Sequence, residues 1–221
     1  MLTVNDDACA VESDLLGGGL SCPDCSGVLG PWGSARGRLL RHGTGTGLAL
    51  VAHRPRRARC RGCKVTHVLL DWALAARRAD TAEVIAAAIG AKIAAGWGHR
   101  PIAAWLGRPA STVRGWLRAY GSCAGAITEA FTGLVHRDGP DAAALWPAPV
   151  PTVAASAMAA VAAYAQVLMK RLGVAELPWQ KAGLAAAGPW LFSTVLWGGG
   201  PLHQLALIPG PVLGKAGHSP G

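Results

Sequence analysis

Four of the six cysteines form two close pairs with the spacing of metal ligands. Cys22-Pro-Asp-Cys25 and Cys60-Arg-Gly-Cys63 each place two thiols on one short turn. Four thiolates suit tetrahedral zinc and leave no position open for water or substrate, so we expect a structural Zn²⁺ ion. A redox centre is the weaker alternative, because thioredoxin-like chemistry uses one such pair at the start of a helix. We interpret His42, His53 and His67 as strand or loop residues, since four cysteines already complete a ligand set.

The 34 residues between the two cysteine pairs exceed the spacing of common zinc ribbons, so we expect an enlarged finger over 36–53. Residues 36–64 carry nine Lys or Arg and no acid, whereas residues 1–24 carry five acids and no base. The bases of segment 36–64 therefore equal the formal net charge of +9, which indicates a polyanionic partner for this part of the chain. In this basic segment, the arginines that we expect to contact DNA phosphates are Arg54, Arg56, Arg57 and Arg59.

Residues 100–120 have the pattern of a helix-turn-helix. Ile102, Ala103 and Leu106 form the inward face of a first helix, and Gly107 is placed for the sharp turn. In the second helix, the inward residues are Val113, Trp116 and Leu117. A short helical hairpin that only packs is the alternative, but the clustered arginines without any acid argue against it.

The outward side of the second helix carries the candidate DNA contacts. We expect Ser111, Thr112, Arg114 and Arg118 to face the major groove, with Arg114 best suited to a guanine because its planar fork makes two hydrogen bonds. Arg108 occupies a turn position that usually holds a small apolar residue, and we expect it to contact a phosphate. The arginines of segment 36–64 and the outward residues of the second helix together predict a protein that binds double-stranded DNA.

Three sequence stretches carry a resemblance to known proteins. They are CPDC, then CRGC followed by KVTHVLL, then GHRPIAAWLGRPASTVRGWLR. Together they resemble an uncharacterised helix-turn-helix family of high-GC bacteria. The layout is also similar to the N-terminal part of insertion-sequence transposases, where a zinc ribbon and a helix-turn-helix recognise element ends. The resemblance covers about residues 20–137 and implies DNA binding without an activity.

The elements that must position these residues suggest a mainly α fold with a small β zinc ribbon at the N-terminus. A helix should run over about 81–96, where Asp80 and Glu83 have the form of a capping box, and Ser122 should cap a new helix after 110–120. The expected order is an acidic flexible arm (1–19), the ribbon (20–72), the helix-turn-helix domain (80–137), a Pro-rich linker (138–151), a C-terminal helix (152–173) and an irregular apolar tail (174–221).

The sequence favours sequence-specific DNA binding over catalysis. A transposase needs three carboxylates around two metal ions, and we expect no enzyme here because no acidic triad stands on a strand pattern. The chain begins without a secretory signal pattern, so we expect a cytoplasmic protein. Prolines and glycines interrupt the apolar tail, so membrane insertion is disfavoured, and we expect the 152–173 helix to form a homodimer. The alternative is a non-catalytic zinc-ribbon adaptor that binds a protein, RNA or a membrane.

Overall fold

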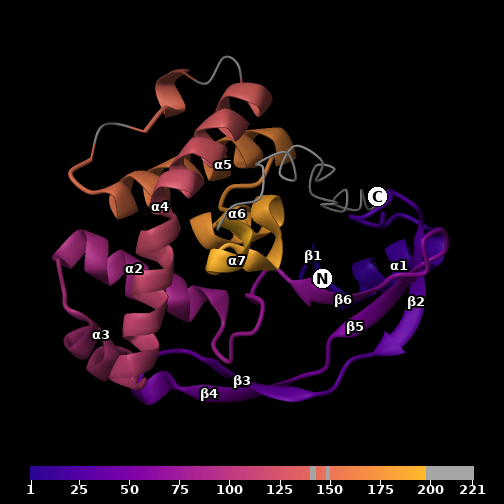
Figure 1. Cartoon of the computed structure of the whole chain (residues 1–221), viewed down its shortest axis with the longest axis horizontal. Coiled ribbons are helices and arrows are strands. Elements are labelled where there is room, and N and C mark those ends of the chain that lie inside the picture. The colour runs from indigo at the N-terminus through magenta and orange to yellow at the C-terminus, as the bar shows by residue number, and fades with distance from the viewer. Residues whose placement is uncertain (140–142, 148–149, 198–221) are drawn as a thin grey trace, which may run out of the picture.

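The computed structural model describes residues 1–139, 143–147 and 150–197 of the chain. It is mainly helical with two small sheets, as the sequence predicts for the fold class. Figure 1 shows the larger sheet at one end of the molecule and the helices at the other, with a two-stranded ribbon running between them along one margin. We call residues 1–34 and 55–71 the sheet unit and residues 82–197 the helical unit, and the ribbon connects the two.

The sheet unit is built on four strands in the order β1-β6-β5-β2. Their bounds are Leu2–Val4 for β1, Leu29–Ser34 for β2, Arg56–Cys60 for β5 and Thr66–Asp71 for β6. Strand β1 is parallel to β6, whereas β6–β5 and β5–β2 are antiparallel. Helix α1, Ala8–Gly17, contributes Val11 and Leu15 to a small core with Leu29, Ala58 and Leu69.

The prediction of a flexible acidic arm over 1–19 is wrong, because this segment forms β1 and α1. Three of its acids have partners within the fold: Asp7 caps α1 by accepting from Cys9 N–H at 2.9 Å, and Glu12 and Asp6 pair with the distant bases Arg56 and Lys181. Leu15 is completely buried, which anchors the helix in the core. Counter-ions and an apolar face therefore order a segment whose composition resembled a solvated tail.

The ribbon consists of β3, Arg38–His42, and β4, Ala49–His53. The two strands are antiparallel, with Leu40 opposite Val51 in the register. A single 3₁₀ turn at Gly45–Gly47 forms the tip and lies against the helical unit, where Gly45 approaches Gly107. The enlarged finger expected from the cysteine spacing is thus a long hairpin that reaches from one unit to the other.

The helical unit surrounds one continuous core. Its helices are α2 (Ala82–Ala95), α3 (His99–Leu106), α4 (Ala110–Asp138), α5 (Val153–Leu172), α6 (Trp179–Ala187) and α7 (Thr194–Trp197), with short 3₁₀ turns at Ala143–Leu145 and Gly188–Trp190. The expected helix start at Ser122 is wrong, because α4 continues through it. Ser122 Oγ donates to Ala119 O at 2.9 Å, while Tyr120, Ala124 and Ile127 stay buried on one face.

The C-terminal helix expected at 152–173 corresponds to α5, which begins after the capping residue Thr152. We expected this helix to form a homodimer. Its apolar side is buried inside this chain, where Ala157, Val161 and Leu168 join the core with α4 and α6. α5 therefore belongs to the helical unit, although 138–151 precedes it. Residues 140–142 and 148–149 of that predicted linker lie outside the described residues.

The prediction of an irregular tail is also wrong for 174–197, where α6 and α7 form and Leu184 and Leu191 are completely buried. Residues 198–221 of the predicted tail lie outside the described residues. In the described part of the chain, α5 is the helix that is long and apolar enough to cross a bilayer, and half of its most apolar window is buried within the fold.

Candidate metal centre and basic surface

The two cysteine pairs lie on loops of the same construction. In the first, Cys22 N–H donates to Gly27 O at 2.7 Å; in the second, Cys60 N–H donates to Val65 O at 2.9 Å. Each loop therefore closes between a cysteine and the fifth residue after it. The residue after each second cysteine, Ser26 or Lys64, has a left-handed backbone with φ of 59° or 67°. This tight turn directs both thiols of a pair to one side.

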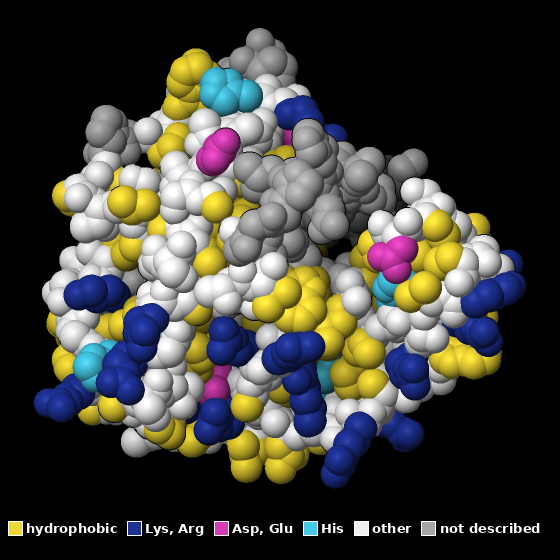
Figure 2. Space-filling view, viewed as in Figure 1, with side chains coloured by type: hydrophobic (Ala, Val, Ile, Leu, Met, Phe, Trp, Pro, Cys, Tyr) yellow, Lys and Arg dark blue, Asp and Glu magenta, His cyan; other side chains and the backbone are white. Residues whose placement is uncertain are grey.

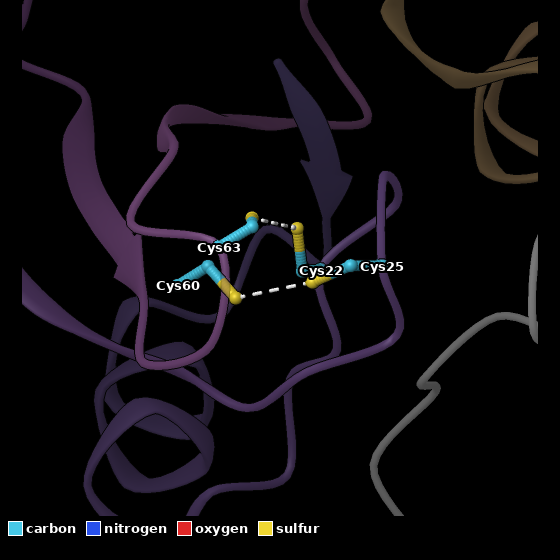
Figure 3. Close-up of side chains that lie close together, drawn as sticks. All are labelled: Cys22, Cys25, Cys60 and Cys63. Carbon is cyan, nitrogen blue, oxygen red and sulfur yellow. Dashed lines mark hydrogen bonds between the residues drawn. The ribbon is translucent and has the colours of Figure 1, made fainter.

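The four sulfurs converge on one point between the loops (Figure 3). The Sγ atoms of Cys22 and Cys63 are 3.7 Å apart, and those of Cys25 and Cys60 are 3.5 Å apart. All four ligand atoms lie within 4.8 Å of one another. Tetrahedral coordination with Zn–S bonds of about 2.3 Å requires S–S separations of about 3.8 Å. The cluster is therefore positioned to hold a metal ion, in agreement with the sequence.

The acid–base chemistry of the cluster also favours a cation. Burial opposes ionisation of Cys60, but hydrogen bonds from the Cys63 N–H and the Cys25 thiol lower its pKa to about 6. Cys63 receives a favourable backbone hydrogen bond from Val65, yet the neighbouring thiols raise its pKa to about 12. Four thiolates at these distances repel one another, so full deprotonation at neutral pH requires a bound positive charge.

His67 on β6 stands beside this cluster. Its side chain is buried, and its Nε2 lies 3.4 Å from Cys22 Sγ and 3.8 Å from an Asp24 carboxylate oxygen. Burial lowers the pKa of His67 and favours the neutral ring. A neutral imidazole can donate Nε2–H to the Cys22 sulfur and orient it, which is the usual work of groups around metal ligands. We interpreted His67 from the sequence as an ordinary strand residue.

A buried ion cluster joins the ribbon to the turn between α3 and α4. The Asp80 carboxylate is 2% exposed and accepts from Arg41 Nη2 at 2.8 Å and from Arg108 Nε. Arg108 also donates to Gly43 O at 3.1 Å, on the ribbon, and to Leu106 O at 2.8 Å. We call these three charged residues, Arg41, Asp80 and Arg108, the Asp80 clamp.

The clamp corrects two predictions made from the sequence. Arg108 is not available to a DNA phosphate, because its side chain is fully buried and its donors are used inside the protein. Asp80 does not form a capping box, since α2 follows Thr81 without a side-chain cap. A buried charge has to be paired, and Asp80 pairs with two arginines far from it in sequence. No sequence pattern around Asp80 predicts that Arg41 and Arg108 are its partners.

The four arginines that we expected to contact phosphates, at positions 54, 56, 57 and 59, differ in what their side chains contact. Arg56 forms a forked pair with Glu12, at 2.9 and 2.7 Å, so it is already neutralised by an acid, contrary to its expected role. Arg59 stacks over the ring of Trp32 at 4.5 Å and donates to Lys64 O. Arg54 is exposed and Arg57 is half-buried. Among these four arginines, Arg54 and Arg57 are the two whose side chains have no hydrogen bond or ion pair in the described part of the chain.

The N-terminal half of α4 separates apolar from basic residues cleanly. Val113 is completely buried and Trp116 is 3% exposed, as predicted. Ser111, Arg114 and Arg118 are exposed on the other side, and Thr112 is half-buried. A three-residue turn, Gly107–Pro109, connects α3 to this helix, and Gly107 adopts a left-handed φ of 67°.

Basic side chains spread over one face of the molecule. Figure 2 shows Lys and Arg across the lower part of this face, over the region where Figure 1 places α3, the start of α4 and the ribbon. The described exposed bases on these elements or directly next to the ribbon are Arg36, Arg54, Arg100, Arg114 and Arg118. We call this set the basic face.

The metal centre and the start of α4 lie on different units that the ribbon connects. The ribbon leaves the sheet unit at the end of β2 and the start of β5, which is the end of these strands opposite the cysteine cluster, and the Asp80 clamp fixes it to the turn before α4. No family model, no curated protein and no solved structure matches this chain.

Proposed function

We propose that this protein binds double-stranded DNA in a sequence-specific manner, with α3 and α4 acting as a helix-turn-helix. The observation that carries the proposal is the exposed row of Ser111, Arg114 and Arg118 on a helix whose opposite side is locked into the core by Val113 and Trp116. A three-residue turn and a small residue, Ala103, at the helix crossing support the same interpretation.

The exposed residues divide into two roles. Arg114 lies one turn into α4, where its planar fork suits the two acceptors of a guanine edge, and Ser111 and Arg118 flank it at helical spacing. Arg54, directly after β4, and Arg57, on β5, are the candidates for phosphate contacts, which position the protein without reading sequence. The Asp80 clamp fixes the ribbon to the turn before α4, so these two parts of the basic face keep their relative positions.

The four cysteines serve this function through structure. We propose that they bind Zn²⁺, which leaves no open coordination position and supplies no catalytic step. The ion ties the start of β2 to the end of β5, because the cysteine pairs flank these two strands. A fixed sheet unit then holds the base of the ribbon, so metal binding supports the basic face from a distance.

Site selection from a random duplex pool, with the zinc-loaded full chain, tests the proposal. Arg114→Ala should weaken binding to the selected sequence by about 5- to 150-fold and leave binding to a scrambled duplex unchanged. Arg57→Ala should weaken binding to both duplexes equally. Lys170→Ala is the matched control, because it removes an exposed positive charge at the end of α5.

Three outcomes contradict the proposal. The first is a pool without any enriched sequence. The second is equal behaviour of Arg114→Ala and Lys170→Ala on the selected duplex. The third is stronger binding to a structured RNA than to the selected DNA, which assigns the same basic face to RNA through its shape and 2′-hydroxyls.

A further inference from the structure

Strand β4 has one free edge. Its other edge pairs with β3. The far side of β3 is bonded at Arg41, whose N–H donates to Ala79 O at 2.8 Å and whose carbonyl accepts from Thr81 N–H at 3.1 Å. Within the described part of the chain, no further strand pairs with β4. Its outward N–H and C=O groups are therefore open to another chain.

The side chains at this edge are apolar and exposed. Leu50 exposes 62% of its surface, Val51 48% and Leu48 44%, and Leu39 on β3 exposes 60%. Proteins usually protect a free edge with a lysine, a proline or a bulge. The sequence of β4, Ala-Leu-Val-Ala-His, contains neither lysine nor proline, and its pairing with β3 is regular. Figure 1 places β4 at the margin of the molecule, where Figure 2 shows apolar atoms.

We propose that β4 pairs antiparallel with β4 of a second copy of this chain, with the twofold axis at Val51. In this register Val51 faces the partner's Val51, and Leu50 faces the partner's Ala52. The nearest basic residue of the edge, Arg54, falls opposite the partner's Leu48, so no like charges oppose each other. The two ribbons then form one four-stranded sheet, and the outer edge of each β3 is already bonded at Arg41, which limits further edge pairing.

The dimer has a consequence for DNA that rests on the proposed function. At about 3.3 Å per residue, the ribbon tip lies about 13 Å from the axis, so the two tips are about 26 Å apart. Each tip contacts the turn before α4, so the start of each α4 is held at an outer end of the joined ribbons. Twofold helix-turn-helix dimers read half-sites about 34–36 Å apart. We therefore infer that the preferred duplex is an inverted repeat with half-sites about one turn apart.

The mass of the zinc-loaded chain in solution, without DNA, tests the dimer alone. Light scattering should give about twice 22.6 kDa for the wild type and for Leu39→Lys. Val51→Lys should give a single 22.6 kDa chain with unchanged zinc content and helical circular dichroism, because it places two lysines on the axis. The two substitutions add the same charge to exposed ribbon residues, but Leu39 is one strand from the axis. A monomeric wild type, or a Val51→Lys chain that still dimerises, overturns the inference.

Cross-linking tests the register. In a Cys9→Ser background, mild oxidation should join two Val51→Cys chains, whereas Leu39→Cys chains should stay separate. Equal cross-linking of both variants overturns the twofold axis at Val51. Val51→Lys should also bind a single half-site as the wild type does and lose the preference for the inverted repeat. A monomer that binds a half-site contradicts only the dimer, whereas a dimer that binds no duplex contradicts only the proposed function.

Discussion

The sheet unit has a small apolar core to which two of the four clustered cysteines belong, whereas the helical unit has a core that extends through α2 to α6. Cys22 and Cys60 fill part of the sheet core, so two residues of the cluster that is positioned to hold a metal ion also contribute to the fold. The helical unit gains its stability from interlocked apolar side chains such as Ile127 and Phe131. The two units therefore differ in what their stability can rest on: a small core beside a candidate metal site in the sheet unit, and extensive apolar packing in the helical unit.

The units also differ in how they use arginine. In the clamp and the sheet unit, Arg108 and Arg56 neutralise the acids Asp80 and Glu12. On α4, Arg114 and Arg118 are exposed. The number of basic residues in a segment therefore measures its charge, but only their contacts show which of them remain free for a partner.

Metal removal is expected to have the largest effect and to separate the units. Structural zinc contributes about 10–16 kcal/mol in small domains, more than the small sheet core can replace. A strong chelator should abolish hydrogen-exchange protection of β2, β5 and β6 and leave α4 and α5 protected. Cys25→Ser should act in the same direction. Retained protection of β5 in zinc-free protein contradicts a metal-dependent sheet unit.

Breaking the Asp80 clamp is expected to uncouple the units. Asp80→Asn leaves Arg41 and Arg108 without their buried counter-ion, and such a change costs about 3–5 kcal/mol. Urea unfolding should show the lost stability and two separate transitions. Glu83→Gln is the matched control, because this exposed acid is three residues away and should change stability little. Equal effects of both substitutions would show that the clamp contributes nothing.

A tight glycine tests the packing of the helical unit alone. A Cβ atom at Gly183 on α6 would lie 2.6 Å from Leu191 Cδ2 and 3.1 Å from Val161 Cγ1. Gly183→Ala should therefore lower the free energy of unfolding by about 1–3 kcal/mol while the zinc content stays constant. Gly133→Ala, on an open side of α4, should instead stabilise by about 0.5–1 kcal/mol. Thermal denaturation of both variants measures this contrast.

The smallest expected effect concerns an exposed link between the units. Asp6 pairs with Lys181 at 2.8 Å, and although burial opposes ionisation, Lys181 keeps the pKa of Asp6 below its usual value. The contribution is therefore present above about pH 4 and is lost as the pH falls through the lowered pKa. Asp6→Asn should cost less than about 1 kcal/mol at pH 7, and the difference from wild type should vanish near pH 2. A constant difference at both pH values contradicts this link.

The sequence predicted features that depend on neighbouring residues. The spacing of Cys22 with Cys25 and of Cys60 with Cys63 was sufficient to predict the four-sulfur cluster, because each pair shares one turn. Periodicity also placed α2 and the buried side of early α4. Such patterns reflect local backbone geometry, which a short stretch of sequence carries within itself.

Features that depend on distant partners were not predictable. Asp80 matched a capping box by spacing, but its partners Arg41 and Arg108 are 39 and 28 residues away. The acidic composition of 1–19 suggested a solvated arm because its counter-ions lie in β5 and α6. Likewise, α4 continues past Gly121 because the buried face of Tyr120, Ala124 and Ile127 outweighs the low helix propensity of glycine.

The salt dependence of duplex binding tests the central claim, that the basic face grips DNA, most directly. The logarithm of the association constant of the zinc-loaded full chain should fall linearly with the logarithm of the salt concentration, with a slope of about −4 to −5 for four to six neutralised phosphates. Arg54→Ala should make the slope less negative by about one. A flat response for the wild type would contradict the account.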